Sequence, residues 1–511
     1  MINHILAWLR APGARAELSY AAPNQLEPDA ITGNDEFKEH QASVDDTNTF
    51  RRLVKPRLLD RWLDRVVEMS GSEYIYLTFL VGLLTWAFLG IRYGGSSTYK
   101  IAISDAQAVV NLIFDAFLMR QQFNQHDNLV MVAGCLRSRI TSHKRMLNSL
   151  IASGNLRRSD SQELRILQQQ TEFVAQLPEP TWATKLSRSI SAFLGHILTI
   201  VGYWVCIFVW LGFGPYCAWS VEWQLYINSA TSALMVLLFA FLANVRERHN
   251  RYSIDCLKAI WKADSALELR LRRLTGDLTD NCAIVMPQRK RGKVQRAIDY
   301  YADLVGTLAG VAILVIIFLV WAACGPVLHF DSNWWLLIGT YAGLVGLNDG
   351  FVLKNVCQNL GDYEDEQFAQ VSHEEIEVLD AIGAGVLEEE HNPGHSLSHR
   401  ISLSMGYFCS HRWTVVLGVI SIFGLIVGAT AMRWSETGQL LCNIPPSIIE
   451  SFFTLILITG HNVGEARRRA DLFRIYERRL KMISFVDSYA STGVGEATGG
   501  DQEVAEVGVI V

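Results

Sequence analysis

Eight stretches of mainly apolar residues recur along the chain and limit the folds that are open to it. An α-helix needs about 20 such residues to cross the hydrocarbon of a bilayer. The stretches cover residues 74–91, 101–119, 195–214, 224–243, 304–324, 335–353, 413–432 and 441–459. Charged residues lie mostly between them and make up only 19% of the chain, compared with about 25% in soluble domains. This pattern predicts an all-α polytopic membrane protein with eight transmembrane helices.

The apolar stretches form pairs that resemble one another. The first member of three pairs ends in Trp-x-x-x-Gly, as WAFLG (86–90), WLGFG (210–214) and WAACG (321–325). A second, more polar stretch follows each of them after a short connection. The fourth pair, 413–432 with 441–459, lacks the Trp and is the most divergent. Internal repeats outrank local propensity as evidence for a fold, so we expect four repeated two-helix hairpins.

Basic residues orient the hairpins. The connections within the pairs are short and hold few Lys or Arg residues. The longer connections hold most of the basic clusters, at 137–145, 246–251, 268–275, 288–293 and 467–469. Under the positive-inside rule these connections lie in the cytosol. We therefore expect both termini to be cytosolic.

The long connections carry apolar residues at helical spacing, notably at 126–153, 158–177, 252–274 and 365–382. Such spacing predicts amphipathic helices, so the second helix of each pair is expected to continue into a cytosolic helical layer. The tail after Ser491 is acidic and rich in Gly, which favours disorder. The expected division is a cytosolic tail at 1–56, helix pairs at 57–125, 185–250, 297–359 and 400–466, cytosolic helical loops at 126–184, 251–296 and 360–399, the last of them acidic, and a cytosolic helix with a disordered tail at 467–511.

A polar stripe follows one face of the second helix in each pair. Asp115, Asp349 and Glu450 place a carboxyl group in this stripe in three of the four copies. One charged side chain at the centre of a bilayer costs about 2.5–3.5 kcal/mol on insertion scales. We therefore expect these acids to face a protein interior, a water-filled path or a cation. The second copy has Met235 and Phe239 at the matching positions, which favours an asymmetric site over a fourfold ring.

Other polar residues accompany these acids as candidate ligands. They are Asn111 and Asp105, with Gln107, Asn348, Asn443 and His461 as supporting candidates. Carboxylate and amide oxygens suit a hard or borderline divalent cation. Hydrogen bonds between helices are the alternative role for the amide and hydroxyl groups. Pro445 and Pro446 predict a broken eighth helix, and Arg120 and Lys354 are expected either to mark the cytosolic interface or to pair with the acids.

Several functional classes lack support. The chain has no P-loop, HExxH or GxSxG motif, so we expect neither an enzyme nor a resident cofactor. Its net charge of −6 gives no electrostatic reason to expect nucleic-acid binding. The clusters HEEIEVLD (373–380) and EEEHN (388–392) suggest a metal site, but a solvated surface helix is the preferred interpretation.

Two helix pairs carry a resemblance to a known family. LDRWLDRVVEMSG with TYKIAISDAQAVVNLIFDAFLMRQQ in the first copy, and GYWVCIFVWLGFGP with EWQLYINSATSALMVLLFAFLANVRERHNR in the second, resemble the fungal low-affinity iron(II) permease family. Weaker similarity in the other copies extends the resemblance over about residues 57–485. The resemblance implies uptake of Fe²⁺ across the plasma membrane, with copper, zinc or manganese as poorer substrates. It assigns no metal ligands.

Two other functions stay open at this point. The same repeats suit a passive ion channel of different selectivity, although acidic side chains disfavour anions. The long cytosolic helices suit a membrane scaffold that recruits partners. Both a monomer and a homo-oligomer remain compatible with the sequence.

Overall fold

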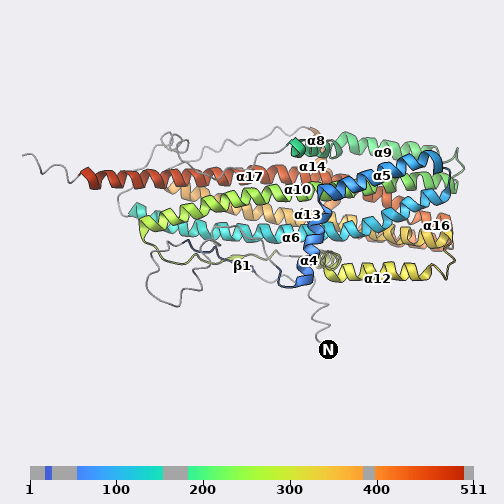
Figure 1. Cartoon of the computed structure of the whole chain (residues 1–511), viewed down its shortest axis with the longest axis horizontal. Helices are drawn as coiled ribbons and strands as arrows, with labels where there is room; N and C mark the ends of the chain where they lie inside the picture. The colour runs from blue at the N-terminus through green and yellow to red at the C-terminus, as the bar shows by residue number, and fades with distance from the viewer. Residues whose placement is uncertain (1–17, 26–54, 153–181, 290, 384–396, 500–511) are drawn as a thin grey trace, which may run out of the picture.

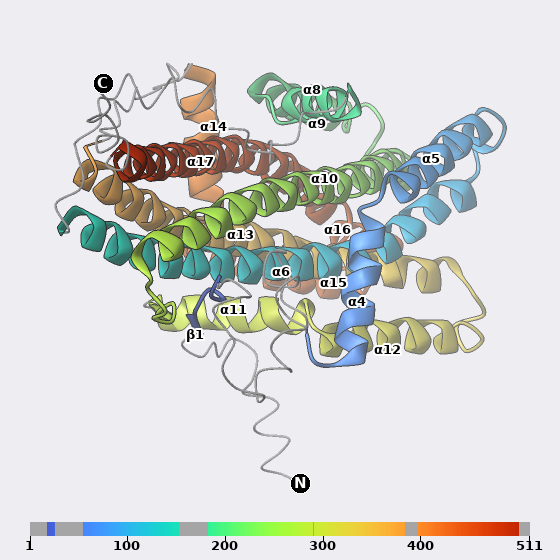
Figure 2. The ribbon, with the colours of Figure 1, turned by 60° about the vertical axis from the view of Figure 1, so that its left-hand side comes forward.

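The computed structural model describes residues 18–25, 55–152, 182–289, 291–383 and 397–499. Four long helices run through it side by side (Figures 1 and 2): α6 (Ser97–Ala152), α10 (Val221–Thr275), α13 (Ser332–Ala381) and α17 (Ile444–Gly499). Each has 50 to 56 residues, which at 1.5 Å per residue is roughly 80 Å. This length is more than twice the bilayer hydrocarbon, about 30 Å. The second apolar stretch of each pair therefore does continue as helix well past its apolar part.

The four long helices form a closed bundle. Both α6 and α17 pack against α10 and α13, so α6 and α17 occupy opposite corners. In one half of the bundle, buried polar residues of the four helices lie among a large apolar cluster. In the other half, a second apolar cluster surrounds buried ion pairs.

Four apolar helices cover only the first of these halves (Figure 1): α5 (Glu73–Tyr93), α9 (Ile197–Gly212), α12 (Leu308–Cys324) and α15 (Arg412–Ala431). Their large side chains point outward, as in Phe88, Phe208, Leu319 and Phe423, which are 63–70% exposed. So much apolar surface in one band is typical of a membrane contact.

Six of the described helices are long and apolar enough to cross a membrane. The number rises to eight if two bent pairs, 188–212 and 293–324, each count as one span. The chain is thus a mainly helical, multi-pass membrane protein.

A short helix precedes each apolar helix, a feature that the sequence analysis missed. These helices are α4 (Leu58–Ser70), α8 (Trp182–Leu194), α11 (Lys293–Val305) and α14 (Leu397–Ser410). The chain bends by 49° between α8 and α9 and by 65° between α11 and α12. In Figure 1, α4 crosses the long helices where the covered half of the bundle ends. The four short helices are placed to lie near a membrane surface.

The Trp residues of the repeated motif stack on the following long helix. Trp86 stacks on Tyr99, Trp210 on Trp223 and Trp321 on Trp334, with ring centroids 5.3, 3.9 and 4.5 Å apart. Trp321 and Trp334 also exchange hydrogen bonds, because the indole N–H of each donates to the backbone carbonyl of the other. The same contact thus recurs in the three copies that have the Trp.

Three smaller features complete or correct the expected fold. Strands β1 (Leu18–Tyr20) and β2 (Ile284–Met286) pair antiparallel, with Leu18 opposite Met286, against the expectation of helices alone. Helix α17 continues past Ser491 to Gly499. The expected helix at 158–177 and the cluster at 388–392 lie outside the described residues.

Candidate metal-ion path

Hydrogen bonds between helices close one end of the polar core. Ser104 on α6 accepts from the amide of Asn228 on α10 at 2.8 Å and from the amide of Asn443, directly before α17, at 3.3 Å. Gly339 on α13 faces the same point, since a Cβ there would lie 2.9 Å from the Asn443 amide nitrogen. Gln107 similarly accepts from Ser232 at 3.2 Å. For Gln107 and Asn443, the structure shows the hydrogen-bonding role between helices.

The three acids of the stripe meet further along the bundle. Asp115, Asp349 and Glu450 come from α6, α13 and α17 and are only 1–2% exposed. The charges of Asp349 and Glu450 both act on Asp115, and that of Asp349 acts on Glu450. The Glu450 carboxylate lies against Gly346, where an added Cβ would be 2.7–2.9 Å from its atoms. The fold thus brings together three side chains that are far apart along the chain and that the sequence pattern had singled out.

Three of the six carboxylate oxygens in this cluster are buried without a hydrogen-bond donor among the described residues. Asp349 accepts from the Tyr301 hydroxyl at 2.6 Å. Within the described part of the chain, however, both oxygens of Asp115, one of Glu450 and both polar atoms of the neighbouring Asn111 side chain lack a partner. Buried polar atoms in folded proteins are nearly always satisfied. A proton or a cation is the compensation that carboxylates can accept at such a place.

The cluster is not a finished coordination shell. Among the described residues, no three His, Cys, Asp or Glu side chains surround one point closely enough to hold a metal ion. Asp105 is buried, and both of its carboxylate oxygens lack a hydrogen-bond partner among the described residues. Asp105 follows the stripe residue Ser104 directly, so its side chain points about 100° away from the stripe around the helix axis. A cation would therefore draw the acids together rather than enter a preformed cage.

The two basic residues beside the stripe do not pair with the three acids. Arg120 binds Asp60 and Asp64 of α4 at 3.1 and 2.6 Å. Lys354 is 3% exposed, and its ammonium group lies near Gly460 of α17. The contact of Arg120 with the crossing helix α4 supports the role of an interface marker.

The eighth apolar stretch is broken, as the two prolines predict. Helix α16 (Glu436–Leu441) ends before Cys442, and α17 begins at Ile444. Pro445 and Pro446 then lie in the first turn of α17, where a missing N–H disrupts no helical hydrogen bond.

A second group of polar residues follows beyond the acids. Gln122 on α6 accepts from Arg246 on α10 and from the thiol of Cys357 on α13, the latter at 3.3 Å. His461 on α17 lies further along and forms a hydrogen bond with His249 on α10 at 2.9 Å. The sequence analysis missed His249, which belongs to a basic cluster counted only for topology. It also missed Tyr301, which no pattern connects to Asp349.

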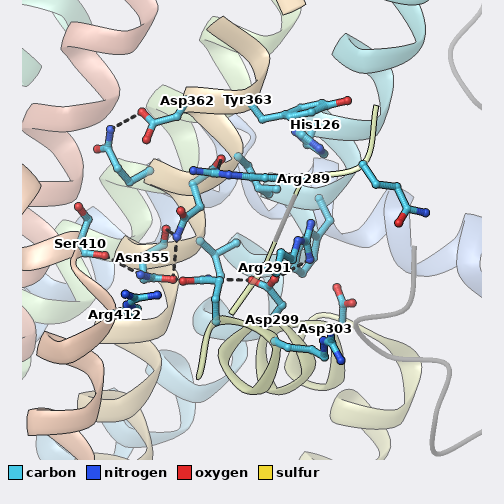
Figure 3. Close-up of a pocket in the computed structure, with 18 of the residues that line it drawn as sticks. His126, Arg289, Arg291, Asp299, Asp303, Asn355, Asp362, Tyr363, Ser410 and Arg412 are labelled. Carbon is cyan, nitrogen blue, oxygen red and sulfur yellow. Dashed lines mark hydrogen bonds and ion pairs between the residues drawn. The ribbon is translucent and has the colours of Figure 1, made fainter. Parts of the chain in front are cut away.

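A pocket among the described residues lies elsewhere (Figure 3). It has a volume of about 780 Å³ between α11, α13, α14 and the segment after β2. Arg289, Arg291 and Arg412 line it together with Asp299 and Asp362. Arg291 and Asp299 form an ion pair across it. None of the three central acids lines this pocket, so it is separate from the polar core.

Comparison with known proteins gives consistent matches. A family model described as low affinity iron permease matches residues 183–280 and 398–477. The low-affinity iron/zinc ion transport protein fet4 of Schizosaccharomyces pombe is 33% identical over 502 residues, which cover 94% of this chain and 85% of that protein. The low-affinity Fe(2+) transport protein of Saccharomyces cerevisiae is 31% identical over 458 residues, or 84% of this chain and 83% of that protein. No solved structure matches.

Proposed function

The chain belongs to the low-affinity iron permease family, and we propose that it carries Fe²⁺ across the plasma membrane through the polar core of α6, α10, α13 and α17. Both relatives are named for low-affinity iron transport. Zinc, which appears in the name of the fission yeast relative, is a second cargo. In this proposal the bent pairs complete eight spans in four hairpins, and both termini are cytosolic.

The cluster of Asp115, Asp349 and Glu450 carries the proposal. These carboxyl groups are buried, act on one another electrostatically and hold oxygens without a donor among the described residues. A divalent cation between them would replace mutual repulsion by attraction. Fe²⁺ would keep part of its water shell, and the membrane potential would favour inward movement by about 2.3 kcal/mol per charge per 100 mV.

In this proposal, the hydrogen bonds at Ser104 form a constriction on the outer side of this cluster. Ser104, Asn228 and Asn443 join three helices there, and Gly339 brings the fourth helix close. Entry of a hydrated ion then requires these amides to release Ser104 and to turn their oxygens toward the ion. Transport with this step is slow and selective by comparison with an open pore.

Uptake of radiolabelled Fe²⁺ by cells that lack other iron importers tests the proposal. We expect Asp115→Asn, Asp349→Asn and Glu450→Gln each to lower the initial rate at least about tenfold, because each removes a charge that faces the ion in a site of low dielectric. Side-chain size is nearly unchanged in all three variants, while the amide that replaces the carboxylate adds an N–H donor. Competition by unlabelled zinc measures the second cargo in the same assay.

Asp380→Asn is the matched control, since Asp380 is exposed near the end of α13 and far from the cluster. It should retain the rate of the unmodified protein at equal surface expression. Normal uptake by all three cluster variants would remove these acids from the transport path. Absence of uptake by the unmodified protein would reject the function itself.

A further inference from the structure

Two histidines from different long helices meet beyond the acid cluster. The Nδ1 atom of His249 and the Nε2 atom of His461 are 2.9 Å apart, within hydrogen-bond distance. Their rings are nearly parallel, at 19°, with centroids 4.9 Å apart. A hydrogen bond between two imidazoles requires one nitrogen to accept, so at least one ring is neutral. Neutral imidazole is the form that binds transition metals.

A carboxylate lies on the same helical face as His461. Glu465 follows it by four residues on α17, a spacing that places the two side chains next to each other. Glu465 is 4% exposed, and one of its oxygens accepts from Arg469 at 2.8 Å. Its other oxygen has no hydrogen-bond partner among the residues that the structure describes. A buried carboxylate, with one of its two oxygens hydrogen-bonded, therefore lies one helical turn from His461.

The position of the pair fits an ion that leaves the acid cluster. His461 lies about 16 Å beyond Glu450 on the same helix, at 1.5 Å per residue. The contact of Arg246 with Gln122 lies between the two levels along the bundle. His249 is 6% exposed, whereas His461 is partly exposed and offers an approach from outside the packed core.

We propose that His249, His461 and Glu465 form a second, transient site for the transported metal at the inner end of the bundle. This inference rests on the proposed function. Two imidazoles and one carboxylate are a ligand set typical of Fe²⁺, whereas Mg²⁺ and Ca²⁺ prefer oxygen ligands alone. The acid cluster offers only oxygens, so the histidine pair supplies selectivity for transition metals that the cluster lacks.

Binding at this site changes two existing contacts. The metal ion replaces the hydrogen bond between the rings, and each imidazole binds it through a nitrogen lone pair. Any proton displaced from those nitrogens passes to the solvent. Glu465 turns part of its carboxylate from Arg469 to the ion, since no such trio already surrounds a single point in the described residues. Nearby arginines, among them Arg246, Arg468 and Arg469, act on His461 and keep the binding weak enough for release.

Equilibrium dialysis of the purified full-length protein against Fe²⁺ without oxygen tests the site. Outer-shell partners alone change metal affinity about 10–100-fold, so His249→Gln and His461→Gln should weaken binding of one equivalent of Fe²⁺ at least about tenfold. Glu465→Gln should weaken the same equivalent. Excess Mg²⁺ should displace Fe²⁺ from the acid cluster but leave the equivalent at the histidines bound.

Two further variants separate a lost ligand from a lost fold. His461→Cys keeps a ligand for transition metals and should bind Zn²⁺ with affinity near that of the unmodified protein, whereas His461→Gln should not. His373→Gln is the control, because His373 is 77% exposed on α13. Asp115→Asn should lower uptake at least about tenfold yet retain this equivalent. If His249→Gln and His461→Gln bind Fe²⁺ like the control, the inference is wrong, and the transport assay still decides the proposed function independently.

Discussion

Gly346 sets the position of Glu450 in the acid cluster. The glycine lies on α13 where this helix faces α17, and the Glu450 carboxylate occupies the space that a Cβ would take. Gly339 and Gly343 lie on the same face of α13, where the segment before α17 packs closely against them. Small residues of this kind allow membrane helices to approach each other. Here they also allow a carboxylate, rather than a methyl group, to occupy the interface.

Gly346→Ala tests this arrangement without removing any ligand. The new Cβ would lie within 2.9 Å of the Glu450 carboxylate, so Glu450 must turn away from Asp115. We expect Fe²⁺ uptake to fall several-fold at equal surface expression. Gly350→Ala, one turn further on α13, is the matched control, since its Cβ would make only an ordinary contact at 3.8 Å. Equal uptake by the two variants would contradict the role of Gly346.

Single residues also show what sequence reasoning reaches and what it does not. Asp115, Asp349 and Glu450 were predictable because a carboxyl group in an apolar helix stands out by its free-energy cost. Tyr301 and His249 were not, because only the fold brings them to Asp349 and His461. That all three acids line one path for the metal ion remains a prediction, which the uptake assays of their variants test.

The repeated Trp-x-x-x-Gly motif acquires a physical reason at the level of helices. In three copies its Trp stacks on an aromatic ring at the start of the next long helix. Its Gly leaves room for an aromatic side chain, which is Tyr99 in the first copy, Trp219 in the second and Phe330 in the third. The motif was visible in the sequence, but its partner ring and the short helices before each apolar helix were not. A repeated motif in the sequence shows that a structural unit recurs. It does not show which surfaces of that unit pack against each other.

Removal of a stacked Trp should weaken the hairpin. An aromatic pair contributes about 0.5–1.5 kcal/mol beyond the area that it buries. Trp210→Ala and Trp321→Ala should therefore destabilise the protein by roughly this amount more than Trp413→Ala does. Trp413 is a suitable control because it is 58% exposed and has no stacked partner among the described residues. Thermal unfolding of the purified protein in detergent measures the difference. Equal midpoints for the three variants would show that the stacks add nothing to stability.

At the scale of the whole molecule, a buried ionic network joins the four long helices in the half without outer helices. Asp264 on α10 contacts Arg139 on α6 at 3.4 Å and Arg479 on α17 at 2.7 Å. Arg479 also contacts Glu375 on α13 at 3.2 Å, and all four side chains are fully buried. The sequence analysis counted the cluster at 137–145 only as a topology signal. A charged residue in the sequence cannot be recognised as buried, because the residues that pair with it lie on other helices.

His143 makes this network sensitive to acid. It is fully buried on α6, 3.9 Å from Asp264. The pKa of His143 is lowered to about 3, mainly by burial; Asp264 opposes this shift, and Arg479 and Arg139 add to it. In the unfolded chain the pKa is about 6.5, so below that pH the unfolded state binds a proton that the folded state does not. The free energy of unfolding should fall by up to about 1.4 kcal/mol for each pH unit from about 6.5 toward 3.

Replacement of this imidazole should therefore reduce the pH dependence of stability. Between pH 7 and pH 5, the unfolding midpoint of the unmodified protein should decrease more steeply than that of His143→Gln, which cannot take up a proton. His373→Gln should keep the full slope, because His373 is 77% exposed and its environment differs little between the two states. The same slope in His143→Gln and in the unmodified protein would assign the acid sensitivity to other groups. A reduced slope would show that this half of the bundle responds to pH through His143, which lies beside Asp264 of the ionic network and not in the acid cluster.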